Sequence, residues 1–202
     1  MLTRHNYFIR EHVGLLKLSD TYDIIDPENQ QLIGFAKEQV PFWAVLLRIS
    51  IQKTLLPTTI SVHQGNNEQS PGPVLFQIKR GLNFGFRTKV EIIDQGGNLV
   101  GWFQKKALSF GGAFLVFDAQ GTQVAKVTGD WTGWEFRFEN LQNKQLGVVS
   151  KRWAGIGKEL FSTADNYMIS LTPTEETSEH NTSLAMLLLA AGLAIDSIFN
   201  ER

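Results

Sequence analysis

The sequence predicts a mainly β protein, a closed antiparallel β-barrel built from hairpin repeats around a buried hydrophobic C-terminal α-helix. Two observations carry this prediction. One hairpin pattern recurs along the chain, and the segment from Leu184 to Ile195 contains no polar side chain. A helix that is apolar on every side must be buried on every side, and a sheet closed into a barrel offers such an enclosure.

The repeat joins an apolar strand, an acidic residue, a turn, an apolar pair and a small residue. Its four copies are YDIIDPENQQLIGFAKE from Tyr22, VEIIDQGGNLVGWFQKK from Val90, FLVFDAQGTQVAKVTGD from Phe114 and FRFENLQNKQLGVVSKR from Phe136. A fifth, degenerate copy runs from Ile60 to Arg80 with a longer turn. Successive hairpins predict an antiparallel meander, which loses its exposed edges when it closes.

The repeated acids have two interpretations. They are Asp26, Asp94, Asp118 and Glu139, each seven or eight positions before its small residue (Gly34, Gly101, Ala125 and Gly147). Acids at turn starts usually accept hydrogen bonds from the turn backbone, and this interpretation is favoured. A calcium site is the alternative, but no turn carries the dense alternation of acids that calcium loops use.

The apolar run near the C-terminus predicts a core helix over 183–199. Twelve helical residues span about 18 Å, well short of a bilayer core of about 30 Å. Asn181, Thr182 and Ser183 precede the run and are candidate N-caps. The whole chain, 1–202, is expected to form one domain with this helix at its centre.

Composition excludes several kinds of function. The chain has no cysteine, which excludes disulfides, thiol nucleophiles and palmitoylation of its residues. Its four histidines lack metal-ligand spacing, and it contains no nucleophile elbow, phosphate-binding loop or zinc-protease motif. The sequence therefore predicts a protein that is not an enzyme. With a net charge of −1, nucleic acid is not expected as a partner.

The charge is unevenly distributed. Residues 74–158 carry twelve Lys and Arg against six Asp and Glu, whereas residues 159–202 carry one against seven. Such asymmetry points to an anionic partner. In addition, the turn Trp131-Thr132-Gly133-Trp134 is a candidate for exposing one indole ring at a membrane interface.

Several segments together resemble the phospholipid scramblase family. They are YFIREHVGLLKLSDTYDIID near the start, the hairpins, VVSKRWAGIGKELFSTADNYMISL, and the ending AIDSIFNE after the apolar run. The wider relatives in this resemblance are LURP-one-related proteins and the tubby C-terminal domain. It covers about residues 7–201 and implies a barrel of twelve strands threaded by the C-terminal helix.

The scramblase resemblance implies calcium-dependent movement of lipids between leaflets. Asp165 and Asn166 match the calcium segment of that family, but Thr163 stands where its first acid would be. The alternation of Tyr167, Ile169 and Leu171 with smaller or more polar neighbours favours a strand instead. Calcium at Asp165 and Asn166 is thus a weak prediction, and no other cofactor is expected.

The tubby resemblance implies recognition of phosphoinositide headgroups by a basic surface. Three basic pairs follow the second strands of their hairpins, at what should be one end of the barrel. The alternative is that these cations only solubilise the strand ends. The candidate anion- or lipid-binding residues are Lys79, Arg80, Arg87, Lys89, Lys105, Lys106, Lys151 and Arg152.

The sequence thus predicts a non-enzymatic, lipid- or phosphoinositide-binding or membrane-tethering domain. Its partners would be anionic phospholipid headgroups or a membrane surface, and its location the cytoplasm or the periphery of a membrane. Two alternatives stay open. One is a genuine calcium-dependent scramblase, and the other is a soluble scaffold that binds an unidentified protein.

Overall fold

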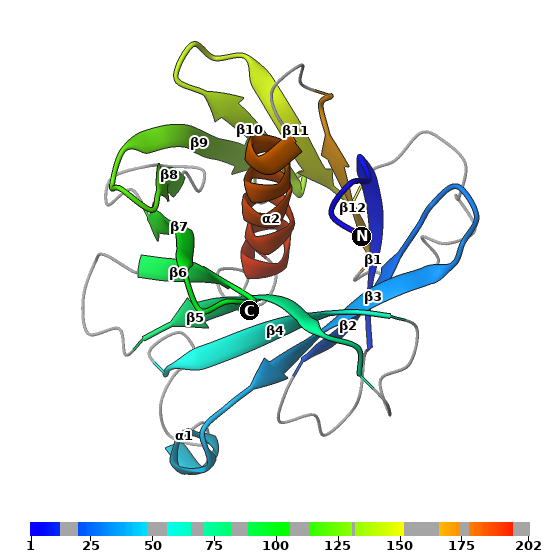
Figure 1. Cartoon of the computed structure of the whole chain (residues 1–202), viewed down its shortest axis with the longest axis vertical. Coiled ribbons are helices and arrows are strands. Elements are labelled where there is room, and N and C mark those ends of the chain that lie inside the picture. The colour runs from blue at the N-terminus through cyan, green and yellow to red at the C-terminus, as the bar shows by residue number, and fades with distance from the viewer. Residues whose placement is uncertain are drawn as a thin grey trace.

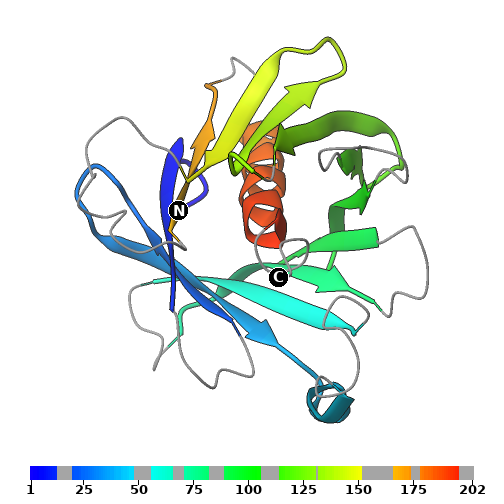
Figure 2. The same ribbon diagram turned by 180° about the vertical axis from the view of Figure 1, so that it is seen from behind.

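The barrel is closed, as the sequence predicts. In the computed structural model the described residues are 1–12, 20–47, 56–65, 71–81, 89–105, 114–130, 132–151, 166–173 and 178–195, and they form twelve antiparallel strands. Each strand pairs with its neighbours in the chain, and β1 pairs with β12 to close the ring (Figures 1 and 2). One helix, α2, fills the ring.

The strands are short, and most of them are joined as hairpins. Their bounds are β1 Asn6–Glu11, β2 Thr21–Ile25, β3 Leu32–Gln39, β4 Thr58–Gln64, β5 Val74–Arg80, β6 Lys89–Asp94, β7 Leu99–Lys105, β8 Phe114–Asp118, β9 Gln123–Asp130, β10 Glu135–Asn140, β11 Gln145–Ser150 and β12 Tyr167–Leu171. The helices are α1 Phe42–Leu47, which follows β3, and α2 Ser178–Ala194.

The two ends of the barrel differ in how the strands are connected there. Because neighbouring strands are antiparallel, β3, β5, β7 and β11 all finish at one end, which we call the exit end. The turns that join β2 to β3, β6 to β7, β8 to β9 and β10 to β11 lie at the other end, which we call the turn end. The start of α2 lies near the turn end, where Leu184 borders the same cleft as the turn residue Asp118.

Five hairpins carry a β-bulge at the same place, whereas the β9–β10 pair keeps one register throughout. The strand register shifts by one residue near the turn in the pairs β2–β3, β4–β5, β6–β7, β8–β9 and β10–β11. A bulge bends its strand and strengthens the twist, and a sheet needs both to close. The five extra residues are all apolar and pack against the core: Ile33, Leu75, Val100, Val124 and Leu146.

The small residue after the bulge lets the wall approach its neighbours closely. A Cβ on Gly101 would lie 2.3 Å from the Phe117 carbonyl oxygen and 3.2 Å from Leu187 of α2. A Cβ on Gly147 would lie 2.7 Å from the Ser170 carbonyl oxygen. The apolar pair and small residue of the repeat are therefore the sequence signature of the bulge and of close packing beside it.

Helix α2 is buried around its whole circumference. Leu187 to Ala191 are consecutive and all buried, and so are Leu193 to Ile195. Five consecutive residues cover every side of a helix, which confirms the predicted core helix. The expected start at Ser183 was wrong, because the helix begins at Ser178 and residues 181–183 lie within it rather than cap it. No helix in the described part of the chain is long and apolar enough to cross a bilayer.

We predict that Leu189→Ala lowers the free energy of unfolding by about 2 to 5 kcal/mol. The side chain is completely buried, so the substitution removes apolar contacts and leaves a cavity between helix and wall. Urea denaturation followed by far-UV circular dichroism measures the change. Leu141→Ala is the matched control, because Leu141 is 55% exposed and its truncation should change stability little. An equal effect of the two substitutions would contradict a core position for α2.

Candidate functional site

The turn acids are turn formers, as favoured from the sequence. Asp118 Oδ1 accepts hydrogen bonds from the backbone N–H groups of Gln120 and Thr122, at 3.0 and 2.8 Å. Asp94 Oδ1 accepts in the same way from the N–H of Asn98 at 2.8 Å. These oxygens are therefore already engaged by their own turns. No group of three or more potential metal ligands occurs among the described residues.

The fourth repeat corrects the expected register. Asn140, not Glu139, occupies the turn position, because its Oδ1 accepts from the N–H groups of Gln142 and Lys144 at 3.0 and 2.9 Å. Glu139 instead pairs on the strand with Lys126, at 3.2 Å. Asn140 precedes Gly147 by seven positions, as Asp94 and Asp118 precede their small residues. An acidic residue was expected at this position, which favoured Glu139. The turn needs only a short side chain that accepts hydrogen bonds, and Asn140 provides one.

We predict that Asp94→Asn lowers the melting temperature at pH 7 and that this difference shrinks on acidification. The hydrogen bonds from the Asn98 backbone and side chain hold the pKa of Asp94 below its ordinary value of 3.8. A carboxyl whose folded pKa is depressed stabilises the fold above its unfolded pKa, and this contribution disappears as pH falls through the folded pKa. Thermal melts at pH 7, 4 and 2.5 test this.

Glu28→Gln is the control for that series, since Glu28 is an exposed turn acid. Its effect should be small at every pH. A constant gap between wild type and Asp94→Asn across the series would show that the charge of Asp94 does not stabilise its turn.

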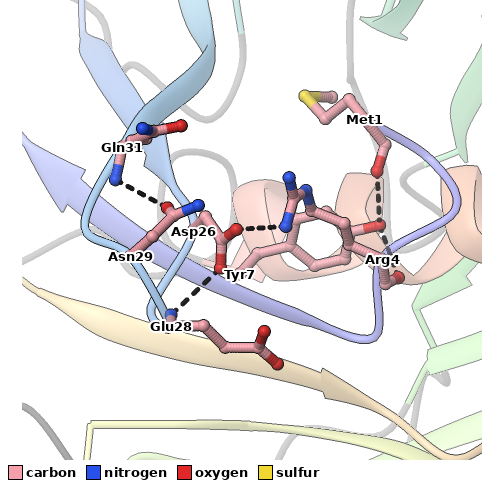
Figure 3. Close-up of polar contacts among 7 residues, drawn as sticks. All are labelled: Met1, Arg4, Tyr7, Asp26, Glu28, Asn29 and Gln31. Carbon is pink, nitrogen blue, oxygen red and sulfur yellow. Dashed lines mark hydrogen bonds and ion pairs between the residues drawn. The ribbon is translucent and has the colours of Figure 1, made fainter.

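The first residues of the chain make a polar cluster at the turn end (Figure 3). Arg4 forms an ion pair with the buried Asp26. The Tyr7 hydroxyl donates to the Arg4 carbonyl at 2.8 Å, and burial raises the pKa of this phenol above its ordinary value. Asp26 also accepts from the Glu28 N–H at 3.0 Å. These contacts hold the N-terminal segment against the first hairpin, so the polar groups of the cluster stabilise the fold.

Three of the predicted basic residues, Lys79, Lys89 and Lys105, are exposed at the exit end. Lys79 lies near the end of β5 and Lys105 at the end of β7, and neither forms an ion pair with a described carboxylate, although Glu91 of β6 is opposite Lys79 in the register. Lys89, by contrast, lies 2.8 Å from the Glu91 carboxylate and 4.3 Å from the centre of the Trp102 ring. Within the described part of the chain, no ion pair holds the charge of Lys79 or Lys105.

Other predicted basic residues are placed differently. Arg80 is buried and donates to the Leu56 carbonyl at 2.9 Å, so it does not face solvent. Lys151 is half-buried, with its ammonium 4.5 Å from the centre of the Trp134 ring. Arg87, Lys106 and Arg152 lie outside the described residues.

The exposed cations do not converge on one point. Strands β5 and β7 are separated by β6, which puts their ends roughly 10 Å apart at ordinary strand spacing. Strand β11, which leads to Lys151, is four strands from β7, or about 20 Å along the wall. A single phosphate needs several cations within hydrogen-bond reach. The arrangement instead suits an extended anionic surface.

The described residues give little support to the predicted calcium site at Asp165 and Asn166. Asn166 is buried at the start of β12, and Asp165 lies outside the described part of the chain. Residues 167–171 form the strand that the sequence favoured, paired on both sides with β1 and β11.

A cleft opens at the turn end, beside the first turns of α2. Its volume is about 660 Å³, within the range of small-molecule pockets. Three of the five bulge residues line it, namely Val100, Val124 and Leu146, together with Leu184 and Leu187 of α2. The turn acids Asp94 and Asp118 also border this cleft, together with neutral polar residues of the turns.

Sequence reasoning missed the exposed aromatic residues. Phe42 is 80% exposed and Trp43 is 48% exposed, both in α1 just beyond β3 at the exit end. The expected exposed ring in the turn at 131–134 is not Trp134, which is buried against Tyr167 at a ring separation of 4.9 Å. Trp131 lies outside the described residues. The missed signal was the segment FWAVLL, which is apolar throughout and directly follows Pro41.

Comparisons with known proteins agree on one family. The family model named Scramblase matches residues 22–202. The chain is 28% identical over 185 residues to a phospholipid scramblase family protein of Schizosaccharomyces pombe. That alignment covers 88% of this chain and 47% of the relative, so the chain spans about half the length of the curated relative it matches. No solved structure matches the chain significantly.

Proposed function

The chain belongs to the scramblase family, and on that premise we propose that it is a non-enzymatic domain that binds anionic phospholipid membranes with the exit end of its barrel. The observation that carries this proposal is the pair of exposed lysines, Lys79 and Lys105, which form no ion pair within the described structure. Bound in this way, the domain would sit at the periphery of a membrane and could tether a protein partner to it.

The spacing of the charges supports a membrane surface over a single headgroup. Lysines about 10 Å apart contact separate headgroups of a bilayer, whereas one phosphoinositide would need them closer together. The turn end carries Asp94 and Asp118 beside the exposed Lys144, and the exit end carries Glu91 and Glu135, each paired with a basic residue. The two lysines without an ion pair and the exposed aromatic residues of α1 therefore favour the orientation with the exit end toward the membrane.

We predict that Lys79→Ala combined with Lys105→Ala weakens binding to phosphatidylserine-containing vesicles roughly thirtyfold. Each lysine near an anionic surface contributes about 1 kcal/mol, and this contribution is screened by salt. Sedimentation with vesicles of varied phosphatidylserine or phosphoinositide content, at low and physiological salt, measures the affinity and its salt dependence.

Lys144→Ala is the matched control, because Lys144 is exposed in the turn between β10 and β11, at the opposite end. It should leave binding unchanged. Equal losses in the two variants would indicate attraction without a preferred face. Absence of wild-type binding at low salt would reject the proposal and favour the protein-interaction scaffold instead.

Lipid scrambling is the second candidate function, and the turn-end cleft is the observation that favours it. Scrambling requires a path that shields either the headgroup or the acyl chain. The cleft offers an apolar floor of bulge residues and α2, with polar turn residues at its border. Its volume of about 660 Å³ is within the range of pockets that bind small ligands.

For scrambling through the cleft, dithionite should bleach more than half of a fluorescent lipid in vesicles that contain the protein. Val124→Trp, which would fill the cleft, should slow this loss while Lys144→Ala should not. Parallel reactions with calcium and with chelator test the metal dependence. Bleaching limited to the outer leaflet in all conditions would exclude scrambling.

A further inference from the structure

Helix α1 exposes an apolar surface that the fold itself does not explain. The segment is FWAVLL, six residues without a polar side chain. In both views of the barrel α1 stands clear of the ring of strands, beyond the end of β3 (Figures 1 and 2). Of the large apolar side chains described, Phe42 is the most exposed, at 80%, and its neighbour Trp43 is 48% exposed.

The strand register places the end of β3, from which α1 follows, two strands from Lys79. Gln39, the last residue of β3, is paired with Thr59 of β4, and Thr59 is paired with Lys79 of β5. The end of β3 is therefore two strands from Lys79, or roughly 10 Å. Phe42 follows Gln39 by three residues, so the aromatic rings and the lysine belong to the same part of the exit end.

We propose that α1 is an interfacial anchor whose Phe42 and Trp43 side chains insert among the lipids of an anionic membrane. Aromatic rings concentrate at the boundary between headgroups and acyl chains, and nearby lysines pair with the anionic headgroups. A helix of six residues is only about 9 Å long, so it can lie in the interface but cannot cross a bilayer. This inference rests on the proposed membrane-binding function and adds the part that would hold the protein there.

The chemistry of the surroundings favours a membrane over another protein. A protein interface needs a contiguous patch with polar groups around it, and its affinity rarely depends on anionic lipid. Here the strand from which α1 leaves the barrel ends two strands from a lysine that forms no ion pair in the described structure. Apolar and basic groups together are the combination by which peripheral proteins bind anionic bilayers.

The test compares Phe42→Ser/Trp43→Ser with Leu141→Ser on vesicles of phosphatidylcholine and phosphatidylserine. Leu141 is 55% exposed but lies in the turn between β10 and β11, at the turn end. Leu141→Ser therefore also removes an exposed apolar side chain, but from the end of the barrel opposite α1. The α1 double variant should bind at least tenfold more weakly, with an unchanged slope of affinity against salt because the lysines are intact. Leu141→Ser should bind like wild type. Equal thermal melts of all three proteins in solution establish that each is folded.

Insertion itself is measured by fluorescence quenching with brominated lipids. Wild type should lose tryptophan emission on brominated vesicles, and Trp43→Phe should lose much less while it still binds. The inference is overturned if the double variant binds like wild type, or if Trp43→Phe is quenched as strongly as wild type. It is also overturned if wild type is a dimer in solution that Phe42→Ser/Trp43→Ser dissociates, since a second copy would then cover α1.

Failure of the anchor and failure of membrane binding give different results. If wild type binds anionic vesicles with a steep salt dependence and the double variant does the same, membrane binding stands and the anchor is rejected. If wild type binds no vesicle at low salt, the membrane-binding function is rejected and the anchor with it.

Discussion

The burial of α2 on all of its sides determines much of the architecture. A helix with no polar face has to be enclosed, and one sheet can enclose it only by closing on itself. Closure requires strong bending, and five hairpins each supply it with one bulge near the turn. The bulges also add apolar side chains to the core, while Gly101 and Gly147 let the wall pack closely. The helix thus fills the interior of the barrel, and the bulged hairpins allow the sheet to close around it.

An interior filled by the protein's own helix leaves the ends and the outer wall for recognition. The two ends differ. The turn end carries carboxylates that accept hydrogen bonds within their own turns, and a cleft beside α2. The exit end carries exposed lysines and the aromatic residues of α1. The proposed orientation on a membrane follows from this combination of apolar and basic groups at one end. The cleft would then face away from the headgroups. Surface binding and lipid scrambling would therefore use opposite ends of the same barrel.

The sequence was most informative where one local pattern determines one local structure. An apolar run without a polar face indicated a core helix, and a repeated turn pattern indicated a meander. Where several residues could do the same task, the pattern was ambiguous: Asn140 replaces an acid as the turn acceptor, so the search for acids shifted the fourth repeat by one residue. Exposure was the hardest property to predict, because it depends on contacts between distant segments. Trp134 packs against Tyr167 and Arg80 against the Leu56 carbonyl, and neither contact has a signature in the local sequence.

Hydrogen–deuterium exchange, with and without anionic vesicles, tests the central claim most directly. That claim is that the intact barrel, with α2 inside it, binds a membrane by its exit end. It predicts that exchange slows in α1 and at the end of β5 on vesicles, and that the amides of α2 stay equally protected in both states. Faster exchange of α2 on vesicles would mean that the helix leaves the core, and protection confined to the turn end would mean that the opposite face binds. Either result would contradict the account.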